Sequence, residues 1–271
     1  MSCRRPARLA AAALAAACAL APGRAPAVEG FPGSTWGDVY WEIPSPGQND
    51  LVLEGWVRQG VAWVRWPAGK AGFVLQTYAT LRYKWDSLGQ DWNNYLGPGA
   101  GAAVDFTGPG IPLVTAGVEY VYQWNTASGT TAPYTAPFAD WYHYWDIQKG
   151  DWPGTTWGSL RWEIPSHGPQ NLILQGWVRQ GWVLHRWTPK PLTFVLSPYL
   201  RIRYKLDTLG LDWNNSLGPG AGLALDLDGL TGLQPAAGIE YAWEKNLRSP
   251  GGVHRVDFIL RWYAFWDLAK R

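Results

Sequence analysis

The sequence predicts an all-β fold: an antiparallel up-and-down β-barrel of about twelve strands, formed by two tandem six-stranded repeats. Three observations predict it. A block at residues 83–94 returns at residues 204–215, with an offset of 121 residues. Long segments alternate apolar with polar residues between turns rich in glycine and proline. The 20 Trp, 13 Tyr, 32 Gly and 21 Pro, against one Met, favour aromatic strands over helices.

The repeat keeps its register along the chain without a gap. Gln59, a polar residue on an otherwise apolar strand face, has Gln180 at the corresponding place. Residues 28–150 and 151–271 are therefore expected to form two half-barrels with the same elements and the same connections.

Residues 1–27 are predicted to be a cleaved signal peptide. Arginines precede an apolar run over residues 9–21, and the small residues Ala25 and Ala27 precede the expected cut. A lipoprotein signal at Cys18 is the less favoured alternative, because Ala15 stands where such a signal prefers leucine.

Removing this segment changes what the composition implies. Both cysteines, Cys3 and Cys18, fall inside it, so the mature chain is expected to hold neither disulfides nor thiolate metal sites. Removing its four arginines leaves 19 basic and 21 acidic residues, a net charge of −2. This balance argues against a nucleic-acid partner, which requires a basic surface.

Six segments of the first repeat show the period-2 alternation of strands. The first sets Val39 and Trp41 against Asp38 and Tyr40. The segments are, in order, residues 35–43, 51–65, 73–86, 96–106, 113–124 and 138–147. Ordinary globular strands have about 5–6 residues, whereas a tilted membrane strand needs about 9–11. Long alternating strands of this kind are typical of outer-membrane barrels.

The later segments follow the same rule. The third has the clearest alternation, the fourth sets small apolar residues against glycines, and the fifth places Glu119 among polar residues opposite valines and tyrosines. The sixth faces Trp141 and Trp145 one way and Asp140 and Tyr142 the other. Each segment therefore offers one face to lipid and one to the interior.

The connections predict an orientation. Residues 44–50, 87–94 and 125–137 would connect strands at one end of the barrel. The shorter stretches at 66–72, 107–111 and 148–154 would connect them at the other. Longer loops at one end are typical of the extracellular side, with the termini on the periplasmic side.

The polar faces predict the residues that line the interior. Both charge signs occur in similar number, so we expect ion pairs that either brace the wall or line a pore, with bracing favoured. Tryptophans near the strand ends suit an aromatic girdle at the membrane interface. The lumen-lining candidates are Glu54, Arg58, Arg82, Lys84, Asp86, Glu119, Arg179, Arg203, Lys205, Asp207 and Glu240.

The repeated loop motif supplies the candidates for recognition. Its Asp and Asn side chains are expected to stabilise a turn by bonding their own backbone. A calcium site is less favoured, because the spacing and terminal Glu of a calcium loop are missing. Stacking of Trp92 and Trp213 on sugar rings stays open. The loop candidates are Asp91, Trp92, Asn93, Asn94, Asp212, Trp213, Asn214 and Asn215.

Catalysis, cofactors and metals are not expected. No nucleophile motif occurs, and none of the four histidines has a histidine at the corresponding place in the other repeat. A barrel enzyme acting on lipid or glycan would need a site in one repeat, around His143, His185 or His254.

The whole mature chain resembles bacterial outer-membrane β-barrel proteins. Its Thr-Trp-Gly openings at residues 35–37 and 156–158, the Asp-Trp-Asn-Asn motif and the Trp-Tyr-x-x-Trp-Asp endings more distantly resemble the C-terminal domain of bacteriophage adsorption protein A. That resemblance implies a phage receptor linked to secretion of surface polysaccharide. The chain departs from usual barrels in ending without a terminal aromatic residue.

Together these features predict an outer-membrane barrel of a Gram-negative bacterium that acts in passage or surface recognition. Its partners would be the lipid bilayer and, by the resemblance, exported polysaccharide or a phage. The alternative is a secreted or periplasmic pair of β-sandwich modules that bind glycans through exposed tryptophans. In a sandwich the apolar face packs against a second sheet.

Overall fold

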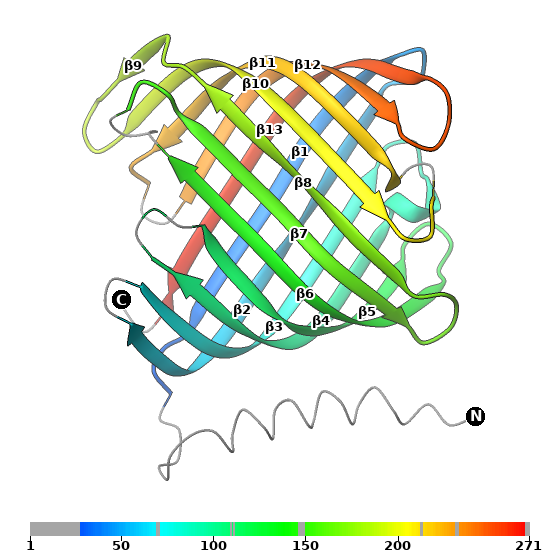
Figure 1. Cartoon of the computed structure of the whole chain (residues 1–271), viewed down its shortest axis with the longest axis vertical. Helices are drawn as coiled ribbons and strands as arrows, with labels where there is room; N and C mark the ends of the chain where they lie inside the picture. Colours follow the sequence, from blue (N-terminus) through cyan, green and yellow to red (C-terminus); the bar gives the residue numbers. More distant parts are fainter. Residues whose placement is uncertain are drawn as a thin grey trace.

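The computed structural model describes residues 28–68, 71–108, 110, 112–145, 150–211, 214–230 and 233–268. These residues form one closed antiparallel sheet (Figure 1). Its strands are β1 (Pro32–Ser45), β2 (Asp50–Ala68), β3 (Ala71–Asp86), β4 (Tyr95–Thr107), β5 (Leu113–Asn125), β6 (Thr131–Trp145), β7 (Gly154–Pro165), β8 (Asn171–Gly181), β9 (His185–Trp187), β10 (Thr193–Asp207), β11 (Ser216–Asp228), β12 (Leu233–Asn246) and β13 (Gly252–Asp267). A 3-10 turn, η1 (Asp91–Asn93), precedes β4.

In the described part of the chain, the barrel has twelve strand positions around its circumference. The thirteen strands occupy only twelve positions because β8 and β9 pair in succession with the same strand, β10. The interruption between them corresponds to a β-bulge in β2, between Ala62 and Val64. Such bulges bend a strand and are common at barrel rims. The predicted barrel class and strand number are confirmed.

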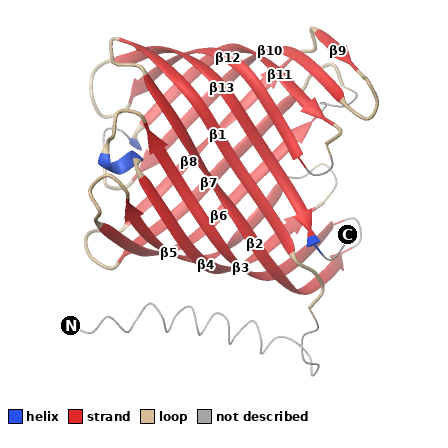
Figure 2. Cartoon of the chain, turned by 180° about the vertical axis from the view of Figure 1, so that it is seen from behind, coloured by secondary structure: helices blue, strands red, loops and turns tan. Residues whose placement is uncertain are grey.

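Two strand pairings, which we call junctions, decide the architecture. β13 pairs with β1 from Asp267 opposite Pro32 to His254 opposite Ser45 (Figure 2). β6 pairs with β7 and so joins the two halves of the chain. The alternative of two separate sandwich modules is wrong, because each half hydrogen-bonds to the other along both of its edge strands.

Two predicted connections are wrong in length. Most of the stretch at residues 66–72 belongs to strands, since β2 continues to Ala68 and β3 begins at Ala71. The long loop at residues 125–137 is reduced to residues 126–130, since β6 begins at Thr131. Pro133 and Pro137 both lie in β6 opposite β5. Pro137 is tolerated because the β6–β7 pairing is interrupted between Thr135 and Phe138, where its missing N–H is not needed. The difference in loop length between the two ends is correspondingly smaller than predicted.

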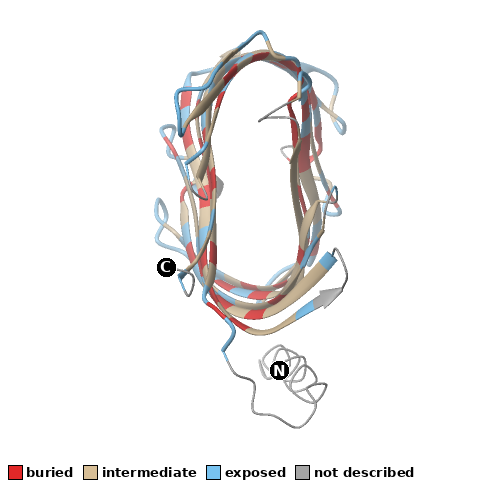
Figure 3. Cartoon of the chain, turned by 90° about the vertical axis from the view of Figure 1, so that its left-hand side faces the viewer, coloured by how far each residue is buried: buried red, intermediate tan, exposed pale blue. Residues whose placement is uncertain are grey.

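The distribution of side chains is inverted relative to a soluble protein. Large apolar residues such as Trp41, Leu81 and Leu200 are exposed on the outer wall. Charged residues such as Glu119, Glu240 and Asp257 are fully buried. The strands form a ring in Figure 3, and buried residues alternate with more exposed ones along them. An exposed apolar surface of this extent marks contact with lipid or another apolar partner.

No helix in the described residues is long and apolar enough to cross a membrane.

The repeated tryptophan and glycine motifs meet where the halves join. The ring of Trp262 covers Gly37, where an added Cβ would lie 2.1 Å from the ring, and Trp141 covers Gly158 in the same way at 2.0 Å. Glycine is required at these positions because the indole lies against the backbone. The Thr-Trp-Gly openings and Trp-Tyr-x-x-Trp-Asp endings thus pack together.

The two out-of-pattern glutamines serve the same junctions. Gln59 donates from Nε2 to the carbonyl oxygen of Phe31 at 3.1 Å and accepts from the indole of Trp266 at 2.8 Å. Gln180 likewise donates from Nε2 to the carbonyl oxygen of Trp152 and accepts from the indole of Trp145, at 3.1 Å each. A polar side chain is tolerated on the apolar wall here because its amide is hydrogen-bonded.

Gly55→Ala is expected to destabilise the barrel by about 1–3 kcal/mol, the usual cost of overpacking. The new Cβ would lie 2.3 Å from the backbone oxygen of Trp36 and 2.6 Å from the hydroxyl of Tyr83. Urea unfolding in detergent micelles measures the change. Gly218→Ala is the control, because its nearest atoms are 3.8 Å away. Equal effects of the two variants would contradict this packing account.

Candidate functional site: the barrel interior

Opposite walls of the barrel touch through two aromatic pairs. Trp36 of β1 stacks on Trp157 of β7, with ring centroids 5.1 Å apart and planes at 6°. Tyr142 of β6 stacks on Tyr263 of β13 at 4.0 Å. Neither pair belongs to neighbouring strands, and the ribbons form an elongated ring (Figure 3). We call these four residues the central seam; it divides the interior into a first-half lobe and a second-half lobe.

Glu119 is the centre of the first-half lobe. It is 0% exposed and accepts hydrogen bonds from Arg82 at 2.6 Å, Arg161 at 3.2 Å and the Tyr78 hydroxyl at 3.1 Å. Arg58 lies 3.9 Å from the same carboxylate. A buried carboxylate of this kind is stable only when several donors surround it.

Glu240 holds the corresponding place in the second-half lobe. It accepts from Arg201 and, at 2.9 Å, from the Tyr199 hydroxyl. The contact repeats that of Tyr78 with Glu119, at residues 121 positions later.

A bidentate ion pair closes the barrel inside the β1–β13 junction. Arg261 donates two hydrogen bonds of 2.6 Å to Asp38. At the β6–β7 junction the same positions hold Asp140 and Ser159, joined by a 2.6 Å hydrogen bond. The two junctions are therefore built on the same positions with different chemistry.

The predicted lumen candidates fall into two groups by their contacts. Arg58, Arg82, Glu119, Arg179 and Glu240 lie in buried ion-pair clusters. Nearer the end that holds residues 87–94, the more exposed Lys84 pairs with Glu54 at 3.2 Å, which also accepts from Tyr40 at 2.6 Å. Arg203 lies over the Tyr40 ring, and Lys205 is partly buried on β10.

Sequence reasoning missed several interior charges, namely Arg161, Arg201, Asp226 and Arg261. Their counterparts in the other repeat are Tyr40, Thr80, Asp105 and Asp140. The charges of Arg161, Arg201 and Arg261 are lost or change sign in the other repeat, so comparing the repeats does not reveal them. Asp226 has an acidic counterpart and could have been found by that comparison. Strand alternation alone would have placed all four on inward faces.

Asp86 and Asp207 anchor loops rather than line a passage. Asp207 accepts from the backbone N–H groups of Gly210 at 2.7 Å and Leu211 at 3.1 Å, and from the amides of Asn214 and Asn215 at 2.9 Å each. Asp86 likewise accepts a hydrogen bond from the side-chain amide of Asn94, at 3.0 Å. These contacts fit the predicted turn, in which Asp side chains satisfy backbone donors.

The remaining loop candidates differ in exposure. Asp91 is exposed and Asn93 partly buried, whereas Asn94, Asn214 and Asn215 are buried. Asp212 and Trp213 lie outside the described residues, as does the side chain of Trp92. In the described part of the chain, no group of three or more His, Cys, Asp or Glu could hold a metal ion.

The histidines that an enzyme would need lie beside aromatic rings. His143 stacks with Trp145 and His185 contacts Trp187 edge-on. His254 shares a 2.6 Å hydrogen bond through Nδ1 with the Tyr241 hydroxyl. In β6 and β13 they alternate with inward-facing Tyr142 and Arg255, so they face outward.

A closed antiparallel barrel with an apolar outer wall and a polar interior defines an outer-membrane type β-barrel protein. The chain matches no protein-family model and no curated protein. Its structure is similar to the β domain of the Bordetella autotransporter BrkA, with 13% identity, a TM-score of 0.48, and coverage of 89% of this chain and 100% of that one. It is also similar to an outer-membrane channel of Pseudomonas putida F1, with 8% identity, a TM-score of 0.44, and coverage of 91% and 100%. It is similar as well to the translocator domain of the autotransporter NalP from Neisseria meningitidis, with 9% identity, a TM-score of 0.39, and coverage of 95% of each chain.

Proposed function

We propose that this protein resides in the outer membrane of a Gram-negative bacterium and acts in recognition at the cell surface rather than in free passage of solutes. The observation that carries the proposal is the central seam: opposite walls touch at 5.1 Å and 4.0 Å between ring centroids. Open porins instead keep an aqueous channel between their walls.

The outer wall supports the membrane location. Its exposed apolar residues lie in the strands, and the tryptophans Trp41, Trp85 and Trp124 are 45–46% exposed near strand ends, as an aromatic girdle would be. The proposed signal peptide, residues 1–27, and the chain end at 269–271 lie outside the described residues. In the proposed orientation, the loops at 87–94 and 208–215 face the cell exterior.

The proposed half-barrels, residues 28–150 and 151–271, are supported by contacts that recur with the 121-residue offset. Tyr78 and Tyr199 both donate to a buried glutamate. Gln59 and Gln180 both receive a tryptophan N–H. An ancestral six-stranded unit that was duplicated accounts for these pairs.

The interior ion pairs are proposed to brace the wall. Arg58, Arg161 and Glu119 are at most 8% exposed in their side chains, so their contacts replace the water that a pore would hold. The recognised partner is proposed to be surface polysaccharide or a phage, as the resemblance implies. The exposed Asp91 and the rest of the anchored loops would contact it.

Conductance in a planar lipid bilayer tests the closed interior. The full chain is expected to insert without stepwise ion current, because the seam and ion pairs fill the lumen. A variant carrying Trp36→Ala, Tyr142→Ala, Trp157→Ala and Tyr263→Ala is expected to conduct, since it loses all four seam rings. Heat-dependent gel mobility confirms that both proteins are folded. Porin-like current steps from the unaltered chain would overturn the proposal in favour of passage.

A further inference from the structure

The first-half lobe contains a pocket at the barrel end where β1 begins and β13 ends. Its volume is about 350 Å³, and it is lined by Trp56, Arg58, Gln76, Asp105 and Asp140 together with seam residues. Arg65 and Asp267 stand at its rim, paired at 2.7 Å. The volume lies at the lower end of the range of about 300–1,000 Å³ typical of small-molecule sites.

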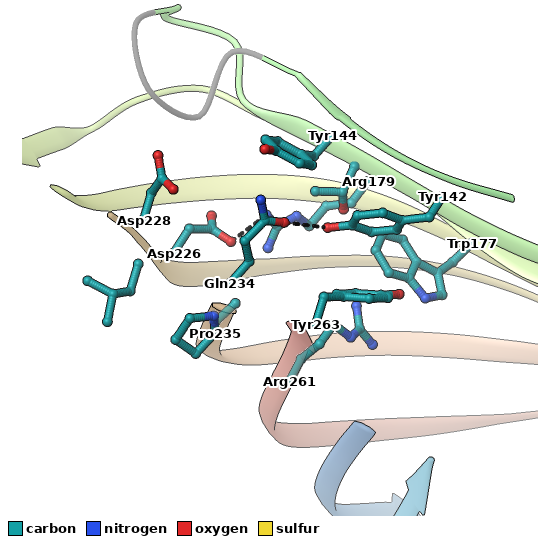
Figure 4. A pocket seen from close by; sticks show the side chains of 13 residues that line it. Tyr142, Tyr144, Trp177, Arg179, Asp226, Asp228, Gln234, Pro235, Arg261 and Tyr263 are labelled. Atoms are coloured by element: carbon teal, nitrogen blue, oxygen red, sulfur yellow. Dashed lines mark hydrogen bonds and ion pairs between the residues drawn. The ribbon is translucent and has the colours of Figure 1, made fainter. Parts of the chain in front are cut away.

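The corresponding pocket of the second-half lobe is closed. Its volume is about 30 Å³. Arg179 donates to Asp226 at 2.7 Å, and Gln234 accepts from Tyr142 at 3.2 Å; both contacts cross the space (Figure 4). Arg58 and Asp105 hold the places of Arg179 and Asp226 in the first half, yet they do not pair.

Two differences between the repeats explain why the first pocket stays open. Gln76 stands where the second half has Ser197, and Thr115 stands where it has Ala236. Asp105 accepts hydrogen bonds from the Gln76 amide and, at 2.7 Å, from the Thr115 hydroxyl. Both neighbours satisfy Asp105 and hold it away from the arginine.

In the second half the same carboxylate has weaker neighbours. The Ser197 hydroxyl lies 3.5 Å from Asp226, and an alanine replaces the threonine. The small serine also leaves room for the Arg179 guanidinium to reach across β10. The salt bridge that fills the second pocket is therefore a consequence of small residues on β10 and β12.

Arg58 is left with unused donors as a result. It is 4% exposed, and its Nε and Nη2 atoms have no hydrogen-bond acceptor. Its nearest carboxylates are those of Asp140 at 3.7 Å and Glu119 at 3.9 Å, and the guanidinium lies over the Tyr78 ring. A buried donor without an acceptor is unfavourable, and an acceptor atom of a ligand in the pocket would remove this penalty.

We propose that this pocket binds a neutral polyhydroxylated ring about the size of one sugar unit. A sugar hydroxyl accepts from the Arg58 guanidinium, while neighbouring hydroxyls donate to Asp105 and Asp140, because each hydroxyl is both donor and acceptor. The aromatic side chains of Trp56 and Tyr142 line the apolar part. An anion fits less well, since three carboxylates and two guanidiniums line the pocket and its rim.

Calorimetric titration of the purified full chain, in a detergent without a sugar head group, tests the site. The probes are glucose, galactose, mannose and N-acetylglucosamine, with galacturonate as the anionic comparison. At least one neutral sugar is expected to bind at a single site, with a dissociation constant on the order of 1 mM. Binding of galacturonate alone, or of no probe, overturns the proposal.

Exchanging the residues that distinguish the two repeats separates this site from adventitious binding. Gln76→Ser with Thr115→Ala is expected to let Asp105 pair with Arg58 and to weaken binding by about tenfold or more. Ser197→Gln with Ala236→Thr is the control at the corresponding positions of the second half. This variant is expected to keep binding at a single site, because Gln234 still crosses the second pocket and Arg261 stands where the first half has Asp140. Heat-dependent gel mobility verifies folding of both. If the folded Gln76→Ser, Thr115→Ala variant binds like the unaltered chain, the proposal is wrong.

Discussion

A chain consisting of the signal segment and residues 151–271 is expected to give no heat-modifiable barrel in outer membranes. In the complete structure β7 pairs with β6, and β13 pairs with β1. Without the first half, both edges lose their partners, and each unpaired backbone group in lipid costs several kcal/mol. The measurement is gel mobility with and without boiling.

Two identical halves are not expected to substitute for the complete chain. Pairing β13 with a second β7 would place each Arg261 opposite Ser159, where the complete barrel has Asp38. A buried guanidinium without its carboxylate costs about 3–5 kcal/mol. Two first halves would instead bring Asp140 opposite Asp38, a pair of like charges.

Co-expression of the two halves is the matched control. Residues 1–150 together with the exported second half restore both junctions, so the heat-modifiable band is expected to return. A second half that is soluble alone and unfolds cooperatively would contradict the single-barrel architecture.

Glu119→Gln is expected to be the most destabilising single substitution of an interior charge, by about 3–5 kcal/mol in the free energy of unfolding. The amide keeps the shape but removes the charge that Arg58, Arg82 and Arg161 share at 3.9, 2.6 and 3.2 Å. Urea unfolding in lipid vesicles, followed by tryptophan fluorescence, measures the loss.

Glu54→Gln provides the comparison, because its pair with Lys84 is more accessible to water, with 26% and 21% of the side chains exposed. Exposed pairs contribute about 0–1 kcal/mol. If the two variants lose equal stability, burial is not what makes the Glu119 cluster important, and the bracing role fails.

Much of the fold could be predicted from the sequence because period-2 alternation is a local property. Each residue in a strand faces opposite to its neighbour, so the inward position of Glu119 and the outward position of Trp85 follow from adjacent residues alone. One exception was the start of β6, where Pro133 and Pro137 fall in the range predicted as a loop. A proline's effect depends on whether the neighbouring strand needs its N–H, which is tertiary information.

The interior site could be predicted only in part. The predicted lumen candidates included only some of the inward charges, and alternation does not show which carboxylate each arginine reaches. Arg58 and Arg179 hold equivalent positions, yet one lines an open pocket and the other closes its counterpart. The difference comes from Gln76 and Thr115 on other strands.

Apart from the start of β6, the strands, their two faces and the barrel class could be predicted from residues adjacent in the chain. Tertiary contacts are needed to show that opposite walls meet at Trp36 and Trp157 and that the barrel is flattened. They also show that the lobes differ in their pockets. Contacts across the interior join residues far apart in the chain, and their distances depend on how the closed sheet curves.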